Sequence, residues 1–275
     1  MKKIIATAVA AAFAVPVYAA DITISGDQEF SWQSNNGATT ASLDGDFNIK
    51  ASTETANGLS VSADINIAED AGNDGSASLT IKGPFGSLDL GDTSSAVDAV
   101  DDATDWGYVL TNGSPNDDAA VLWTLPSMVP GLTVYVSTGA DATDGAADGA
   151  AHTGYAVKYS NSGLTVAFGQ NDNDDDSEEQ VVSLSYSMGG LSVAAETHTA
   201  TTAAGAETDT ELLGVTYSMG DLTFAVETRE DGTNDDTVLG VHYGLGGGVT
   251  AFIETLEDDN AAADETVAVG VTMKF

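Results

Sequence analysis

The sequence predicts an all-β transmembrane protein, an antiparallel up-and-down β-barrel of sixteen strands. Three observations support this prediction. Apolar and small polar residues alternate with a period of two almost everywhere after residue 20, which is the pattern of strands with one apolar face. Short Gly-bearing turns alternate along the chain with longer acidic segments. Finally, no Lys or Arg falls on the apolar face of a predicted strand, as a lipid-facing surface requires.

The first residues have the layout of a secretory signal peptide. Lys2 and Lys3 precede an apolar run from Ile4 to Val17, and the small residue Ala19 follows at a cleavage position. The alternative is a membrane anchor, but the run is shorter than the roughly 20 residues that a spanning helix needs. We therefore expect residues 1–19 to be a signal peptide and residues 20–275 to form the barrel domain.

Alternation places the sixteen strands one after another. In "SLDGDFNIKAS", for example, Leu43, Phe47 and Ile49 lie on one face, and Asp44 and Asp46 on the other. The predicted spans are 22–33, 42–52, 59–67, 76–82, 86–92, 119–125, 132–138, 153–160, 164–170, 180–188, 191–198, 211–219, 222–229, 237–244, 249–255 and 266–275. No helical stretch is expected after the signal peptide.

The connections predict a meander of hairpins. Even-numbered strands end in tight turns such as "GPFG", "NSG", "MGG" and "MGD", whereas most odd-numbered strands end in acidic segments such as "EDAGNDG" and "EDDNAAADE". All long loops then lie at one end of the sheet. The segments 185–198 and 216–229 repeat the same strand, turn and strand. One hairpin cannot pair its own edges, but many hairpins closed in a ring can.

The polar faces are expected to line a water-filled interior. A water-soluble sandwich would carry many Lys, Glu and Arg on its polar face, whereas here that face is mostly Ser, Thr, Gly and Ala. The charged residues expected on the pore wall are Asp27, Glu29, Asp44, Asp46, Lys50, Asp64, Lys82, Asp89, Lys158, Glu196, Glu227 and Arg229. Those expected to face lipid include Leu43, Phe47, Ile49, Val134, Val166, Phe168, Leu213, Phe224, Val226, Val269 and Val271.

Two further groups bear on this register. Nine aromatic residues lie near strand ends on the apolar face, where rings favour the membrane interface: Phe30, Trp32, Trp123, Tyr155, Tyr159, Tyr186, Tyr217, Tyr243 and Phe275. Five apolar residues point inward instead: Leu122, Val181, Leu212, Val238 and Phe252. They are expected either to pack under loops or to mark a slip of the register.

Composition excludes several classes of function. The chain has 7 Lys and Arg against 43 Asp and Glu, a net charge of -36, so nucleic acid is not an expected partner. The apolar fraction of 42% argues against a disordered acidic chain. No Gly-rich phosphate loop, His-Glu-x-x-His motif or nucleophile elbow is present. We therefore expect neither an enzyme nor a required cofactor.

One acidic segment is a candidate for a divalent cation. "NDNDDDSEE", Asn171–Glu179, offers carboxylates for Ca²⁺ or Mg²⁺ but lacks the spacing and the Gly of an EF-hand loop. The candidate ligands are Asp172, Asp174, Asp176 and Glu179. The alternative is a solvated acidic loop.

The whole mature chain resembles the Gram-negative general porins, particularly their short alphaproteobacterial-type members. The resemblance rests on the opening "ISGDQEFSW", the hairpin "GPFGSLDLGD", the sixteen strands and the end "VAVGVTMKF". It implies a homotrimer in the outer membrane of a Gram-negative bacterium, in contact with lipid and lipopolysaccharide. It also implies that divalent ions bridge acidic loops to lipopolysaccharide, and that barrel-assembly machinery reads the terminal Phe275.

The same resemblance implies a constriction inside the barrel. The long loop after strand five, about residues 93–118, would fold into the lumen with Asp98, Asp101, Asp102 and Asp105; the alternative is a solvated surface loop. The cluster of arginines that often faces this loop in the family is lacking here. A cation-preferring channel for passive diffusion of small hydrophilic solutes is therefore expected. The alternative is a structural or adhesin-like barrel with Ca-organised acidic loops, although sixteen strands favour an open channel.

Overall fold

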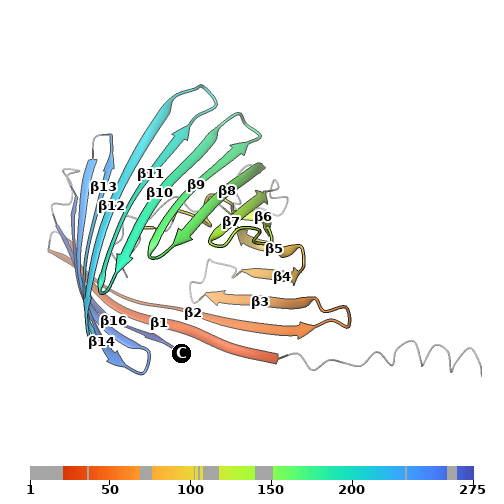
Figure 1. Cartoon of the computed structure of the whole chain (residues 1–275). Coiled ribbons are helices and arrows are strands. Elements are labelled where there is room, and N and C mark those ends of the chain that lie inside the picture. The colour runs from red at the N-terminus through yellow and green to blue at the C-terminus, as the bar shows by residue number, and fades with distance from the viewer. Residues whose placement is uncertain are drawn as a thin grey trace, which may run out of the picture.

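The computed structural model is a closed barrel of antiparallel strands (Figure 1). It describes residues 21–35, 37–68, 76–101, 103–104, 106–107, 118–139, 151–232, 234–258 and 265–275. The predicted signal peptide lies outside the described residues. Among the described residues, no helix has the length and apolar character of a membrane span.

Sixteen strands form the wall, as the alternation predicted. They are β1 (Asp21–Asn35), β2 (Ala38–Glu54), β3 (Ser60–Ala68), β4 (Ala77–Gly83), β5 (Gly86–Ser94), β6 (Asp118–Thr124), β7 (Leu132–Thr138), β8 (His152–Asn161), β9 (Leu164–Asn173), β10 (Glu178–Met188), β11 (Leu191–Thr201), β12 (Glu207–Met219), β13 (Leu222–Asp231), β14 (Asn234–Gly246), β15 (Val249–Asp258) and β16 (Thr266–Lys274).

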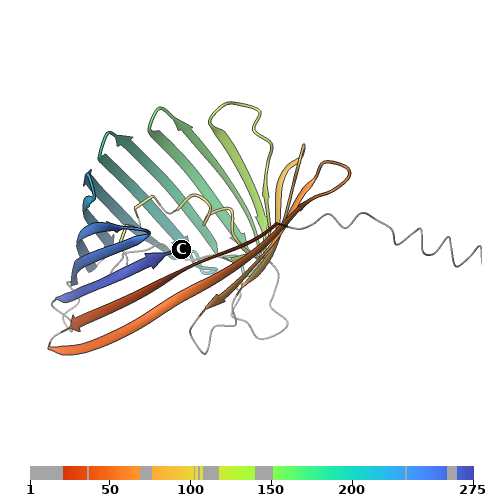
Figure 2. The same ribbon diagram turned by 90° about the horizontal axis from the view of Figure 1, so that it is seen from below.

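Each strand pairs with its neighbours in the sequence, and β1 pairs with β16 to close the ring (Figure 2). Closure removes the two exposed edges that an open sheet would have. The pairing of β1 and β2 is the longest, running from Asp21 opposite Ser52 to Asn35 opposite Ala38. The up-and-down meander expected from the connections is confirmed.

The repeated "YSMG" phrase forms tight turns. Gly189 follows β10 and Gly220 follows β12, each with φ +63, in the left-handed region that glycine adopts without steric cost. The flanking strands pair as far as Met188 with Leu191, and Met219 with Leu222. The repeat therefore encodes two successive hairpins of the wall.

The outward face is apolar, as expected for contact with lipid. All nine aromatic residues expected there are exposed on the isolated barrel, as are Leu43, Phe47, Val166, Phe168, Leu213, Phe224, Val226, Val269 and Val271. The indole Nε1 of Trp123 donates to the carbonyl oxygen of Phe85 in a turn at 2.9 Å. This satisfies the polar end of a ring that is otherwise apolar.

The five inward apolar residues are all buried inside the barrel. Leu122 and Val181 pack against Val97 and Val100, which belong to the segment after β5. Val238 and Phe252 pack with Ala268 of β16. Pairing through Val181 and Leu212 is continuous, so the register does not slip there. Packing under a loop is confirmed for Leu122 and Val181, whereas Val238 and Phe252 pack against residues of neighbouring strands.

Candidate functional site

The segment that follows β5 turns into the barrel. We call its described residues, 95–101, 103–104 and 106–107, the inner segment; in Figure 2 it is the yellow trace inside the ring. It begins with a helical turn, in which the amide of Ala99 donates to the carbonyl of Ser95 at 3.1 Å. The Ser95 hydroxyl also accepts from the amide of Asp98 at 3.1 Å, which satisfies a donor at the start of the turn.

Small residues on the wall allow the inner segment to approach closely. Ala96, Val97 and Val100 are buried against Ala156 of β8 and Ala167 of β9. A Cβ atom at Gly169 would lie 3.1 Å from Cα of Val97 and 3.0 Å from a methyl group of Val100. The apolar side of the inner segment is therefore packed against β8 and β9, where a larger residue would not fit.

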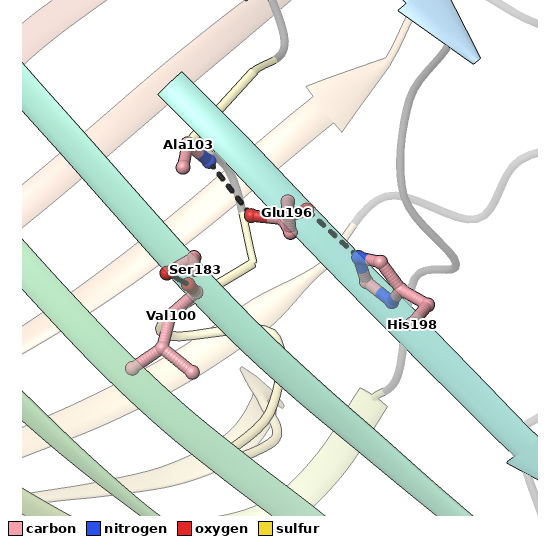
Figure 3. A network of polar contacts seen from close by, with 5 residues as sticks. All are labelled: Val100, Ala103, Ser183, Glu196 and His198. Atoms are coloured by element: carbon pink, nitrogen blue, oxygen red, sulfur yellow. Dashed lines mark hydrogen bonds and ion pairs between the residues drawn. The ribbon is translucent and has the colours of Figure 1, made fainter. Parts of the chain in front are cut away.

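Polar side chains of the wall then pair with the inner segment, strand by strand. The amide of Ala96 donates to the hydroxyl of Ser137 on β7 at 2.9 Å. On β9, the side chain of Asn171 donates to the Ser95 hydroxyl at 3.2 Å. On β10, the Ser183 hydroxyl donates to the carbonyl of Val100 at 2.9 Å (Figure 3). The bonds of Ser137 and Ser183 satisfy backbone groups that would otherwise be buried without partners.

Two buried carboxylates hold the far end of the inner segment. Oε2 of Glu196 on β11 accepts from the amide of Ala103 at 3.2 Å, and Oε1 lies 2.7 Å from Nε2 of His198 (Figure 3). Glu227 on β13 accepts from the amide of Trp106. Glu196 and Glu227 are each only 2% exposed. A buried carboxylate is costly unless it is hydrogen-bonded, and here the partners are the inner segment and a histidine.

This geometry corrects part of the expected pore wall. Glu196 and Glu227 face the interior, as predicted, but the inner segment covers them, so they do not line water. Lys158 is also partly covered, and its Nζ donates to the carbonyl of Ala99 at 3.2 Å. The expectation missed this because all three were assigned from strand alternation, without the segment that packs over them.

The carboxylates predicted to line the constriction are not equally exposed. Asp101 was expected to face the lumen, but its side chain is buried, with only 1% of the residue exposed. Asp98 is half-buried on the helical turn. Asp102 and Asp105 lie outside the described residues.

The opposite side of the ring carries a compact acidic patch, which we call the acidic wall: Asp27, Glu29, Asp44 and Asp46. Asp27 of β1 lies directly opposite Asp46 of β2, and Glu29 lies opposite Asp44. These four side chains and Gly45 line a cavity of about 170 Å³. In the closed order of sixteen strands, β2 stands half a ring away from β10, so the acidic wall faces the side on which the inner segment is docked.

Three of the remaining predicted wall charges, Lys50, Asp64 and Arg229, lie close to a residue of opposite charge. Nζ of Lys50 lies 3.6 Å from Oδ2 of Asp64, and Arg229 lies 3.6 Å from Asp231. Asp89 accepts from the Thr80 hydroxyl at 2.5 Å. Lys82 is exposed on β4. Lys50, Asp64 and Arg229 are thus partly neutralised by neighbouring charges, whereas four carboxylates lie together on the acidic wall.

The four carboxylates proposed for a divalent cation do not come together. Asp172 is paired opposite Glu178 on the outward face, whereas Glu179 is opposite the inward-facing Asn171. Between the strands, hydrogen bonds from Ser177 hold the pKa of Asp175 below its ordinary value. Within the described part of the chain, no group of three or more acidic or histidine residues is arranged to hold a metal ion.

Sequence reasoning missed the residues that dock the inner segment. Ser137, Asn171 and Ser183 look like any polar residues of a barrel interior; the partners of Ser137 and Ser183 are backbone groups, and that of Asn171 is the Ser95 hydroxyl. The available signal was the run of inward Ala and Gly on β8 and β9, which leaves room for something to lie against the wall.

The comparisons with known proteins agree with this architecture. A family model described as Gram-negative porin matches residues 6–263. A loop-deletion mutant of OmpT, an outer membrane protein of Vibrio cholerae, is 15% identical with a TM-score of 0.75, over 94% of this chain and 100% of that one. A triple mutant of the Rhodopseudomonas blastica porin is 17% identical with a TM-score of 0.71, over 93% and 100%. An anion-selective porin from Comamonas acidovorans is 13% identical with a TM-score of 0.70, over 93% and 100%. No curated protein matches the chain.

Proposed function

Because the chain belongs to the Gram-negative porin family, whose members are non-enzymatic channels of the outer membrane, we propose that its pore prefers cations. Small hydrophilic solutes would cross it by passive diffusion. The family relationship accounts for the channel, and the distribution of charge inside this barrel supports the preference.

The acidic wall is the observation that carries the proposal. Four carboxylates meet on two neighbouring strands and line one cavity. A channel wall with one sign of charge concentrates the opposite ion. Salt screens this effect, because the Debye length falls from about 30 Å at 0.01 M to about 3 Å at 1 M.

Among the described residues, the docked side of the lumen offers little positive charge to offset the acidic wall, and its two glutamates are covered. Glu196 and Glu227 are covered, and both are hydrogen-bonded to the inner segment. The charge of Arg229 is offset by Asp231, which lies 3.6 Å away. In the described parts of β7 to β10, Lys158 is the one lysine or arginine. The sign of the selectivity should therefore follow the acidic wall.

Reversal potentials across a planar bilayer with a salt gradient test the proposal. We expect a cation-selective potential at low ionic strength that declines as salt rises. The double variant Asp44→Asn with Asp46→Asn should reduce the cation-to-anion permeability ratio several-fold. The matched control is Glu230→Gln with Asp235→Asn, which removes the same charge from the outward face. An anion-selective wild type would contradict the proposal.

The assembly is also part of the proposal. An OmpT structure from Vibrio cholerae is described in a trimer form, and we propose a homotrimer for this chain, with lipid and lipopolysaccharide around it. The alternative of a structural or adhesin-like barrel makes an opposite prediction, since it needs no open lumen. Stable conductance steps after reconstitution would exclude it, and a sealed bilayer would favour it.

A further inference from the structure

A cavity lies between the inner segment and the tight-turn half of β8 to β11. Its volume is about 270 Å³, and its lining includes Ala99, Val100, Ala103 and Trp106 of the inner segment and Lys158, Thr165, Ser183, Ser185, Ser187 and Ser192 of the wall. This volume is just below the roughly 300–1,000 Å³ of typical small-molecule sites, so the cavity suits a small solute. We name it the hydroxyl pocket.

Lys158 is the one charged residue among the described residues that line the hydroxyl pocket. Lys158 lies directly opposite Thr133 on β7 and Ala167 on β9, neither of which is charged. It forms no ion pair within the described part of the chain. One of its three donors reaches the carbonyl of Ala99 at 3.2 Å, which leaves two donors for another acceptor.

The other polar groups are hydroxyls. The hydroxyls of Ser187 and Ser192 lie 2.8 Å apart, and that of Thr165 lies 3.0 Å from Ser160. Each member of such a pair keeps further capacity to donate or accept. The Ser185 hydroxyl has no hydrogen bond to the described residues. A solute bearing several hydroxyl groups would therefore meet several matching partners.

Trp106 supplies a flat apolar surface beside these groups. A Cβ atom at Gly214 of β12 would lie 2.8 Å from its indole ring, so the ring rests against the wall at a position where there is no side chain. The hydrogen bond from its amide to Glu227 fixes its backbone. An indole ring can pack against the carbon chain of a solute while hydroxyls bond elsewhere.

We propose that the hydroxyl pocket is a transient binding site for small polyhydroxylated carboxylates, such as sugar acids, on the tight-turn side of the constriction. Lys158 receives the carboxylate, the serine and threonine hydroxyls receive the hydroxyl groups, and Trp106 contacts the carbon chain. This inference rests on the proposed function, because the solute reaches the pocket through the lumen.

Binding is tested with gluconate as the probe. Ligand-observed NMR titration of the folded protein in detergent measures binding without relying on conductance. In about 1 M KCl, repulsion by the acidic wall is short-ranged, since the Debye length is about 3 Å. Gluconate should bind. Sorbitol lacks the charge and should bind about tenfold more weakly or worse, because it loses a hydrogen bond to a charged group. Acetate lacks the hydroxyls and should be weaker by about tenfold or more, because it loses several neutral hydrogen bonds.

Variants locate the site. Lys158→Gln should weaken gluconate binding by about tenfold, and Ser185→Ala by a smaller factor. Ser185 forms no hydrogen bond with the inner segment, so its variant keeps the test informative if the Lys158 variant loosens that segment. Lys82→Gln is the matched control, because it removes a lysine from the inner wall away from the pocket, and it should bind gluconate normally.

The outcomes separate the two proposals. Gluconate binding that is weakened by Lys158→Gln and Ser185→Ala but not by Lys82→Gln supports the hydroxyl pocket. If the reconstituted protein then fails to conduct, only the proposed channel function is overturned. Ordinary conductance without gluconate binding overturns the pocket and leaves the channel standing. Binding that is equal for gluconate and acetate, or unchanged in both pocket variants, also overturns it.

Discussion

The backbone amide of Ala103 donates to Oε2 of Glu196 at 3.2 Å, although the two residues lie 93 positions apart in the chain. The other oxygen of the same carboxylate lies 2.7 Å from His198. The position of the inner segment, and with it the free cross-section of the lumen, therefore depends on a side chain of β11. The inner segment is held as a ligand would be, by directed bonds from a rigid wall.

Replacing Glu196 should loosen the inner segment without opening the barrel. Glu196→Ala leaves a buried amide without its acceptor, at a cost of about 1–3 kcal/mol, so hydrogen exchange at Ala103 should accelerate by about tenfold or more. Glu196→Gln keeps an acceptor and should change exchange much less. Glu230→Ala, on the exposed outward face, is the control. Unchanged hydrogen exchange at Ala103 in Glu196→Ala would contradict the prediction, because it would show that other contacts hold the inner segment in place without Glu196.

Cysteine accessibility should distinguish three classes of strand residue. Cysteines that replace Asp44 and Asp46 should react quickly with a hydrophilic thiol reagent, because both positions are open to water in the lumen. Those that replace Phe168 and Leu213 should stay unreactive in a lipid bilayer. A cysteine at Glu196 should react slowly despite its inward direction, because the inner segment covers it. Fast labelling there, comparable to position 44, would contradict the docked arrangement.

The sequence predicts the strands of the barrel but not the docking of the inner segment, because different interactions determine the two. The strands and their facing follow from alternation, because one side of Phe47 or Val226 must meet an apolar phase and the other side water. The docking of the inner segment does not follow from any such pattern. Its partners are backbone amides and carbonyls, which every residue carries, and they meet Ser137 or Glu196 only after the ring has closed. For the same reason the sequence identified Val181 as an exception but could not say what covers it.

The acidic wall should cost the barrel stability while it supports selectivity. Asp27 lies directly opposite Asp46, and like charges in directly opposed positions destabilise a strand pair. Asp46→Asn should therefore raise the temperature at which the folded barrel is lost at low salt, as followed by the heat-dependent gel shift. The gain should shrink in high salt, because screening already weakens the repulsion in the wild type. Asp235→Asn, on the outward face, is the control for a general effect of charge. An equal rise of the unfolding temperature in that variant would show that repulsion between Asp27 and Asp46 is not the cause.

The C-terminal residue should have separable roles in stability and in assembly. Phe275 extends the closing pair of strands, since its amide donates to the carbonyl of Gly26 at 2.9 Å and its carbonyl accepts from the Gly26 amide at 3.0 Å. Its ring lies 6.0 Å from that of Phe47. Phe275→Ala keeps the two backbone bonds and loses only the ring contact, whereas deletion of residue 275 removes all three.

If the terminal ring is also read by the assembly machinery, the two variants will differ between settings. Refolding of purified protein into lipid vesicles should be nearly normal for Phe275→Ala and slower for the deletion, because only the deletion weakens ring closure. In cells, both variants should accumulate poorly in the outer membrane, because both lack the terminal aromatic ring. Phe275→Tyr is the matched control, since it keeps a ring that can contact Phe47. Normal assembly of Phe275→Ala in cells would show that the residue acts only in closing the barrel.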